Sequence, residues 1–182
     1  MIAPVLPMLA AQAKPFNSAE YFFEVKWDGV RALAAVEEGG WRLWGRGLAD
    51  YRPRYPELAV LTALPSGTLV DGELVVFRDG LPRLGDVLQR HQLVDSLKIR
   101  QASRQRPVNY VLFDLLAVRG RCLLREPFLI RRGLLRDLLN EHKLAPLRLS
   151  DGVAECGERF FAQAVAQGHE GVIAKKAAWS AA

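Results

Sequence analysis

The chain has 182 residues, half of them apolar and a quarter charged, which is the composition of a globular protein and excludes the disordered and fibrous classes. The 25 Lys and Arg residues outnumber the 20 Asp and Glu residues, and the net charge of +5 favours contact with polyanions without requiring it. No stretch approaches the roughly 18 apolar residues of a membrane span, and Cys122 and Cys156 match no metal-ligand spacing, so we expect a cytoplasmic protein that does not bind membranes.

The N-terminal half has the pattern of strands joined by tight turns. Aromatic and β-branched side chains predict strands over residues 21–26, 31–36, 41–44 and 68–77. The double glycine Gly39-Gly40 predicts a hairpin between the second and third of these strands. Asp79-Gly80 predicts another turn, because this pair tolerates positive φ. Leucines three residues apart predict a helix over residues 55–64.

The C-terminal half predicts helices and two further strands. Apolar periodicity indicates helices over residues 84–88, 130–138 and 160–165, and apolar runs indicate strands over residues 110–116 and 171–174. Pro127 suits the start of the second helix and Gly168 the end of the third. Hairpins with helices inserted between the strands favour an α+β domain with largely antiparallel sheets flanked by helices. No phosphate-binding glycine-rich loop is present, which argues against a βαβ dinucleotide fold.

The first candidate for chemistry is the segment that runs from Glu24 to Arg31. Lys26 ends a predicted strand, Asp28-Gly29 makes a turn, and Arg31 begins the return strand. A lysine in such a place can be desolvated, which favours the neutral and nucleophilic amine. An ordinary hairpin with solvated charges is the commoner explanation of this spacing alone, because Asp-Gly turns are frequent.

Three further segments place polar or aromatic side chains in apolar strands. Alternation puts Asp71 and Glu73 on one face, where they would hold a divalent cation or a ribose, or lie solvated on an edge strand. Phe113 would stack on a purine base, although a core position is the better explanation from its pattern alone. Glu170 would bind a metal and Lys175 a phosphate, or both would lie in a solvated turn with a basic end.

In this order the segments resemble the motifs of the covalent nucleotidyltransferases, which comprise ATP-dependent DNA ligases, RNA ligases and mRNA capping enzymes. The matching segments are residues 26–31 (the nucleophile motif Lys-x-Asp-Gly-x-Arg), 71–73, 113–116 and 170–175. Residues 7–10 and 52–58 resemble the ligase domains of bacterial end-joining proteins. The resemblance implies a single adenylation domain over residues 1–182 with the DNA ligase/mRNA capping enzyme nucleotidyltransferase fold, which is ATP-grasp-like.

The resemblance also implies a chemistry for these residues. Lys26 would attack the α-phosphorus of ATP and become lysyl-AMP, with Mg²⁺ or Mn²⁺ held by Glu73 and Glu170. Arg46 resembles the family arginine that engages a 5′-phosphate at a nick. The residues expected to contact ATP or AMP are Glu24, Lys26, Arg31, Arg46, Glu73, Phe113, Glu170 and Lys175.

The implied substrate is nicked or broken DNA in a bacterial cytoplasm. A later family motif, Trp-x-Lys-x-Lys, is not found, since Trp179 is not followed by lysines. We therefore expect an adenylation domain that is truncated at its C-terminal end, lacks the oligonucleotide-binding (OB) domain, and is impaired in strand joining unless a partner supplies that domain. Two alternatives stay open: an RNA ligase-type nucleotidyltransferase, and a non-catalytic nucleotide- or DNA-binding module.

Overall fold

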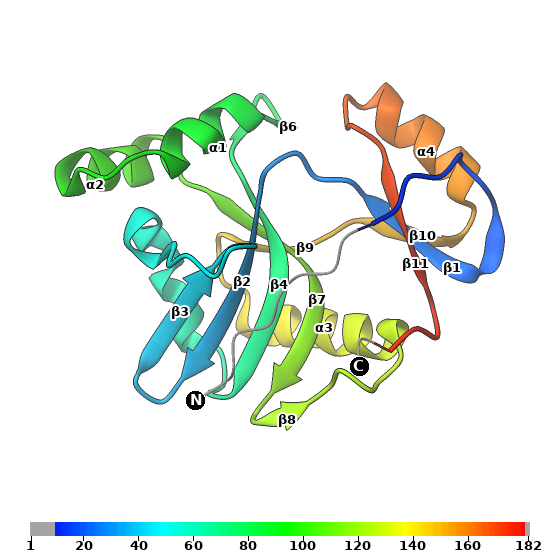
Figure 1. Ribbon diagram of the computed structural model, residues 1–182, viewed down its shortest axis with the longest axis horizontal. Helices are drawn as coiled ribbons and strands as arrows, with labels where there is room; N and C mark the ends of the chain where they lie inside the picture. The colour runs from blue at the N-terminus through cyan, green and yellow to red at the C-terminus, as the bar shows by residue number, and fades with distance from the viewer. Residues whose placement is uncertain (1–9, 181–182) are drawn as a thin grey trace.

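The computed structural model describes residues 10–180, which form two main β-sheets with helices packed against them (Figure 1). The larger sheet has the strand order β3-β2-β4-β7-β8, with β9 also paired to β7, and the smaller has the order β10-β1-β11. Among the described strands every pairing is antiparallel except that of β7 with β9. The expected α+β architecture with largely antiparallel sheets is thus confirmed.

The elements follow one another along the chain with short connections. The strands are β1 (Ser18–Val25), β2 (Val30–Glu37), β3 (Gly40–Trp44), β4 (Thr68–Val75), β5 (Phe77–Arg78), β6 (Leu81–Pro82), β7 (Asn109–Val118), β8 (Arg121–Cys122), β9 (Leu147–Leu149), β10 (Gly152–Glu155) and β11 (Val172–Lys176). The helices are α1 (Leu84–His91), α2 (Ser96–Gln105), α3 (Phe128–His142) and α4 (Gly157–Ala166), with 3₁₀ segments η1 (Arg52–Arg54) and η2 (Pro56–Ala63). Within the described residues, no helix has the length and apolar character that a bilayer crossing needs.

The larger sheet separates a hydrophobic core from the face that carries the polar candidates. Alternation along β2 sends Ala32 and Ala34 into the main core, where α1, α3 and η2 pack on the sheet. Leu33 and Ala35 point to the opposite face and join a smaller apolar cluster. Helix α4 packs instead on the smaller sheet, as Figure 1 shows. The candidate side chains of β2 and β4 therefore lie on the side of the larger sheet that is turned away from the main core.

The expected hairpin from Lys26 to Arg31 is wrong. Strand β1 pairs with β10 on one edge and with β11 on the other, so neither edge is left for β2. Strand β2 pairs with β3 and β4 in the larger sheet. The Asp28-Gly29 segment therefore carries the chain from one sheet to the other, instead of reversing it within one sheet.

Gly29 is needed for a close approach of two backbones at this crossing. A Cβ atom at Gly29 would lie 2.3 Å from the carbonyl oxygen of Leu74 and 2.9 Å from Cγ of Glu73. We expect Gly29→Ala to push β2 away from β4 and to cost about 1–3 kcal/mol of unfolding free energy. Gly39→Ala is the matched control, since nothing lies within 4 Å of its Cβ position. Denaturant unfolding compares the two variants, and equal stabilities would contradict the argument.

Other local expectations were confirmed or shifted. The strand expected over residues 68–77 ends at Val75, and a short hairpin of β5 and β6 follows. Its turn has positive φ at Asp79 (54°) and Gly80 (78°), as the sequence predicts. The helix expected over residues 55–64 is a 3₁₀ segment, in which three residues per turn align Leu58 with Leu61 on the buried side. Helix α2 and strands β8, β9 and β10 were not predicted.

Candidate active site

A cavity of about 940 Å³ lies between the two sheets and gathers most of the predicted site residues. Its walls come from β1 and β11 of the smaller sheet and from β2, β4 and β7 of the larger one. The predicted residues that line it are Glu24, Lys26, Arg31, Arg46, Glu73, Phe113 and Lys175. Glu170 is not part of the wall, but its carboxylate pairs with Lys26. Residues spread over some 150 positions of the chain therefore meet around one cavity of nucleotide size.

Lys26 lies directly after β1, at the mouth of the cavity. Its backbone N–H donates to the carbonyl of Gly171 at 2.9 Å, and its ammonium group pairs with the Glu170 carboxylate. The side chain is 42% exposed, so the protein alone does not provide the desolvation that the sequence suggested. In the chain by itself, Lys26 is an ion-paired ammonium group at the edge of the pocket.

The end of α4 determines where Glu170 lies. Gly168 has φ of +85°, and its N–H donates to the carbonyl of Val165 at 3.0 Å. The N–H of His169 donates to the carbonyl of Ala164 at 3.0 Å, which completes a Schellman motif. The glycine cap that the sequence predicted is confirmed, and it turns the chain so that Glu170 faces Lys26.

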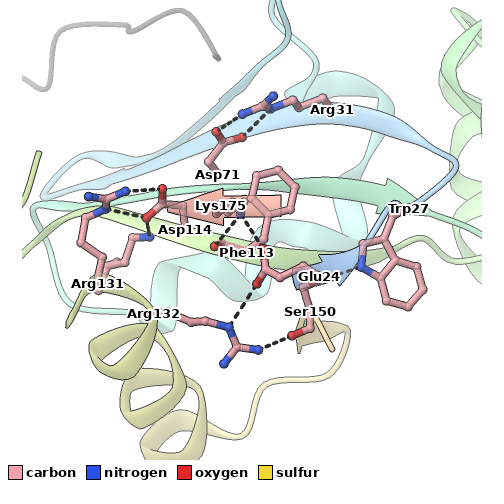
Figure 2. A network of polar contacts seen from close by, with 11 residues as sticks. Glu24, Trp27, Arg31, Asp71, Phe113, Asp114, Arg131, Arg132, Ser150 and Lys175 are labelled. Carbon is pink, nitrogen blue, oxygen red and sulfur yellow. Dashed lines mark hydrogen bonds and ion pairs between the residues drawn. The ribbon is translucent and has the colours of Figure 1, made fainter. Parts of the chain in front are cut away.

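The acidic pair of β4 lies on one face of a central strand. Asp71 accepts two hydrogen bonds from Arg31, from Nε at 3.1 Å and from Nη2 at 2.7 Å (Figure 2). Both Asp71 and Glu73 line the cavity, as alternation predicted. The alternative of solvated acids on an edge strand is wrong, because β4 lies between β2 and β7. Burial raises the pKa of Glu73 to about 8, and the neighbouring charge of Arg31 offsets this only in part.

Glu73 should make the stability of the chain depend on pH. Because its pKa is about 8 in the folded chain against 4.5 normally, folding retains a proton that the unfolded chain releases. As far as Glu73 is concerned, the unfolding free energy is highest below pH 4.5, where both states are protonated. It falls as the pH rises toward 8. Glu73→Gln should therefore gain stability relative to the parent across this window, by at most about 1.4 kcal/mol per pH unit.

Denaturant unfolding at several pH values measures the effect of Glu73→Gln. The control is Glu38→Gln, which removes an exposed carboxyl in the β2–β3 turn. A stability difference between Glu73→Gln and the parent that does not change with pH would show that burial of Glu73 does not govern its protonation.

A β-bulge in β7 aims Phe113 into the cavity. Asp71 pairs with Asp114 while the next residue of β4, Gly72, pairs with Leu112, so Phe113 is the extra residue. Phe113 and Asp114 consequently both line the cavity, although consecutive residues of a regular strand point to opposite faces. The core position favoured by its sequence pattern is wrong, since Phe113 is only partly buried.

Cations surround the Phe113 ring in the chain alone. The Lys175 ammonium lies 4.4 Å from the ring centroid, and the Arg31 guanidinium carbon lies 5.2 Å from it. Lys175 also pairs with Oε2 of Glu24 at 2.5 Å. Both cations are thus within cation–π distance of the ring, and each is also paired with a carboxylate, Lys175 with Glu24 and Arg31 with Asp71.

Glu24 is the most deeply buried of the predicted residues, with 1% of its surface exposed. Besides Lys175, its carboxylate accepts a hydrogen bond from Nε of Arg132 at 3.1 Å (Figure 2). Arg132 in turn donates from Nη2 to the carbonyl of Ser150 at 2.6 Å. Sequence reasoning missed Arg132 and Ser150, because neither lies in a motif and Arg132 resembles any other charged residue of an amphipathic helix.

Glu73 and Glu170 are the carboxylates near the cavity that remain as candidate metal ligands. The described residues hold no cluster of three or more His, Cys, Asp or Glu side chains placed for one ion. Asp71 is bound by Arg31 and Asp114 by Arg131, which leaves Glu73 and Glu170 as the candidates that were predicted. Mg²⁺ is usually held by one or two carboxylates together with substrate phosphates, so the chemistry of these two side chains suits it.

Comparison with known proteins agrees with this geometry. Residues 4–180 match the family model of the ATP dependent DNA ligase domain. The chain belongs to this family. It is 36% identical over 188 residues to a probable DNA ligase of Sorangium cellulosum, which covers 98% of this chain and 34% of that protein. It is 33% identical over 180 residues to DNA ligase C1 of Mycolicibacterium smegmatis, which covers 95% of this chain and 52% of that protein.

The fold of this ligase domain is also found in a solved structure. Mycobacterial DNA ligase D complexed with ATP and MES superposes with a TM-score of 0.77 and 30% identity over 96% of this chain and 55% of that chain. The nucleotidyltransferase fold and the similarity to bacterial ligase domains, both expected from the motifs, are thus confirmed. The chain spans 34% and 52% of the two curated relatives, so their activities as whole proteins are not transferred directly.

Proposed function

We propose that this DNA ligase domain transfers AMP from ATP to its own Lys26, as the first step of joining nicked or broken DNA. The observation that carries the proposal is the convergence of the motif side chains on one cavity, with Lys26 at its mouth and paired with Glu170. The related mycobacterial ligase D, which has ATP bound, supports ATP as the nucleotide.

The nucleotide would lie along the cavity from the Phe113 ring to Lys26. Phe113 stacks on the adenine, and Arg31 holds the ribose, as the family resemblance implies. Glu24 reads the adenine amino group through its backbone or through its carboxylate, which two cations already hold. Lys175, beside the Phe113 ring, contributes positive charge to the same anionic ligand.

The proposed reaction is an in-line displacement at the α-phosphorus. The Lys26 ammonium group first loses one proton, the neutral amine then forms the new N–P bond as the bond to the pyrophosphate oxygen breaks, and the nitrogen releases its second proton to water. Glu170, which contacts this ammonium group, would take the first of these protons and pass it to water, so that its carboxylate is charged again. A bound Mg²⁺ would supply positive charge to the phosphates, with Glu73 and Glu170 as its protein ligands.

The later steps would use DNA. The 5′-phosphate of a nick displaces Lys26 and takes the AMP, and the neighbouring 3′-hydroxyl then displaces AMP and seals the strand. Arg46 lines the cavity and is exposed, and it would engage the 5′-phosphate.

Adenylation is tested by incubating the chain with α-³²P-labelled ATP and Mg²⁺. The expected result is a covalent label that peptide mapping assigns to Lys26, with no label from GTP. A chain that binds ATP without becoming labelled would overturn the proposal in favour of a non-catalytic nucleotide-binding module. Sealing of a nicked duplex is then compared with sealing of a nicked RNA strand, and a preference for RNA would overturn the DNA assignment.

A further inference from the structure

Trp27 directly follows Lys26 and is held by three separate parts of the chain. Its indole N–H donates to Oγ of Ser150 at 2.9 Å. Its ring packs in an edge-to-face arrangement with His169, with centroids 5.2 Å apart, and with Phe77, with centroids 5.9 Å apart. The cavity also includes Trp27 in its wall. A residue without an assigned role thus connects the Lys26 segment to the β9–β10 connection, to β5 and to the end of α4.

Ser150 is itself fixed from both sides. It is buried, its N–H donates to the carbonyl of Leu112 at 2.8 Å, and its own carbonyl accepts from Arg132 at 2.6 Å. Arg132 also donates to Glu24, two residues before Lys26. Figure 2 shows the resulting ring of contacts, from Glu24 through Arg132 and Ser150 to Trp27. The side chains of Glu24 and Trp27, on either side of Lys26, are therefore linked to each other through Arg132 and Ser150.

The Lys26 segment and the Glu170 segment also run side by side. Lys26 pairs with Glu170, and its N–H donates to the carbonyl of Gly171, while Trp27 meets His169. Consecutive residues of one segment thus contact consecutive residues of the other. A shift of Trp27 would move both partners of the ion pair relative to the cavity.

We propose that Trp27 and Ser150 are positioning residues, which hold Lys26 at its place of attack through the indole-to-hydroxyl hydrogen bond. The inference rests on the proposed adenylation, which needs the reacting atoms within about 3–3.5 Å of each other. A displacement of about 1 Å can lower a rate about a hundredfold without weakening ligand binding to the same extent. The bond thus acts on the rate of adenylation more than on ATP affinity.

Two variants remove this hydrogen bond from its two ends. Trp27→Phe deletes the donor and keeps an aromatic ring, and Ser150→Ala deletes the acceptor. In single-turnover adenylation each should lower the maximal rate about tenfold and leave the half-saturating ATP concentration within about twofold. Because both delete the same bond, the double variant should be no slower than the slower single variant. Additive losses, or losses in ATP affinity alone, would overturn the proposal.

The matched control removes a hydrogen bond of similar length elsewhere. Tyr55→Phe deletes the contact of Oη with Nδ1 of His91 at 3.0 Å, in the core on the far side of the larger sheet. It should lower the melting temperature and leave the adenylation rate unchanged. If Tyr55→Phe slows adenylation as much as Trp27→Phe, the effect is one of general stability and the positioning role is refuted.

A second readout does not depend on adenylation. Limited reductive methylation, followed by mass spectrometry, compares the labelling rate of Lys26 with that of the exposed Lys98. Loosening the Trp27 bond should weaken the Lys26–Glu170 pair and raise the relative labelling of Lys26 at least about threefold in both variants. Labelling at the parent rate overturns the positioning role. If the two variants show the raised labelling of Lys26 but the parent chain forms no adduct with ATP, only the proposed function is refuted.

Discussion

Lys26→Arg is expected to abolish the covalent adduct with ATP, by at least about a thousandfold, while the chain folds as before. The arginine keeps the positive charge and can still pair with Glu170, because the site is partly exposed. A guanidinium group cannot be deprotonated in a protein, however, so it offers no nucleophile to the α-phosphorus. Intact mass measurement after incubation with ATP and Mg²⁺ reports the adduct directly.

The control for this substitution is Lys98→Arg on the exposed face of α2, which should form the adduct at the parent rate. Mapping the adduct is essential, because Lys14, Lys175 and Lys176 also line the cavity. Lys175 is the least suited of these, since the buried carboxylate of Glu24 holds its ammonium group. An adduct that persists in Lys26→Arg on any of these lysines would show that the nucleophile has been misassigned.

Local sequence rules predicted the parts of the site that depend on neighbouring residues. Alternation placed Asp71 and Glu73 on one face, and Gly168 ended α4 with the predicted left-handed turn. The positive φ values of the Asp79-Gly80 turn follow from the same kind of rule. In each case the conformation of a few adjacent residues decides the outcome, and one sequence contains that information.

The remaining features depend on residues that are distant in sequence. Strand β1 cannot pair with β2 because β10 and β11, more than 120 positions later, take both of its edges. The partner of Glu24 is Arg132, 108 residues away, and the exposure of Lys26 depends on how the two sheets enclose the cavity. The bulge at Phe113 requires the register of β4 against β7. No local pattern encodes these pairings.

Arg131→Met is expected to cost about 3–5 kcal/mol of unfolding free energy. Arg131 is fully buried in α3, and it donates to Asp114 from Nε at 2.8 Å and from Nη2 at 2.9 Å. Its Nη1 donates to the carbonyls of Glu126 at 2.6 Å and Trp179 at 3.3 Å. Methionine fills the space but leaves the buried Asp114 without its cation. Asp114 adjoins Phe113 in the bulge, so we expect ATP affinity to fall as well.

The exposed pair of Arg119 and Glu141, 3.7 Å apart, supplies the comparison for this cost. Arg119→Met should change stability by no more than about 0.5 kcal/mol, because water already solvates both charges. The cost of Arg131→Met should come from the Asp114 carboxylate, which is left buried without a cation. Adding Asp114→Leu should then restore most of the stability, because a buried ion pair contributes little more than a well-packed apolar pair. Urea unfolding of both single variants and the double variant decides this. A double variant as unstable as Arg131→Met would show instead that the two backbone carbonyls, deprived of their donor, carry the cost.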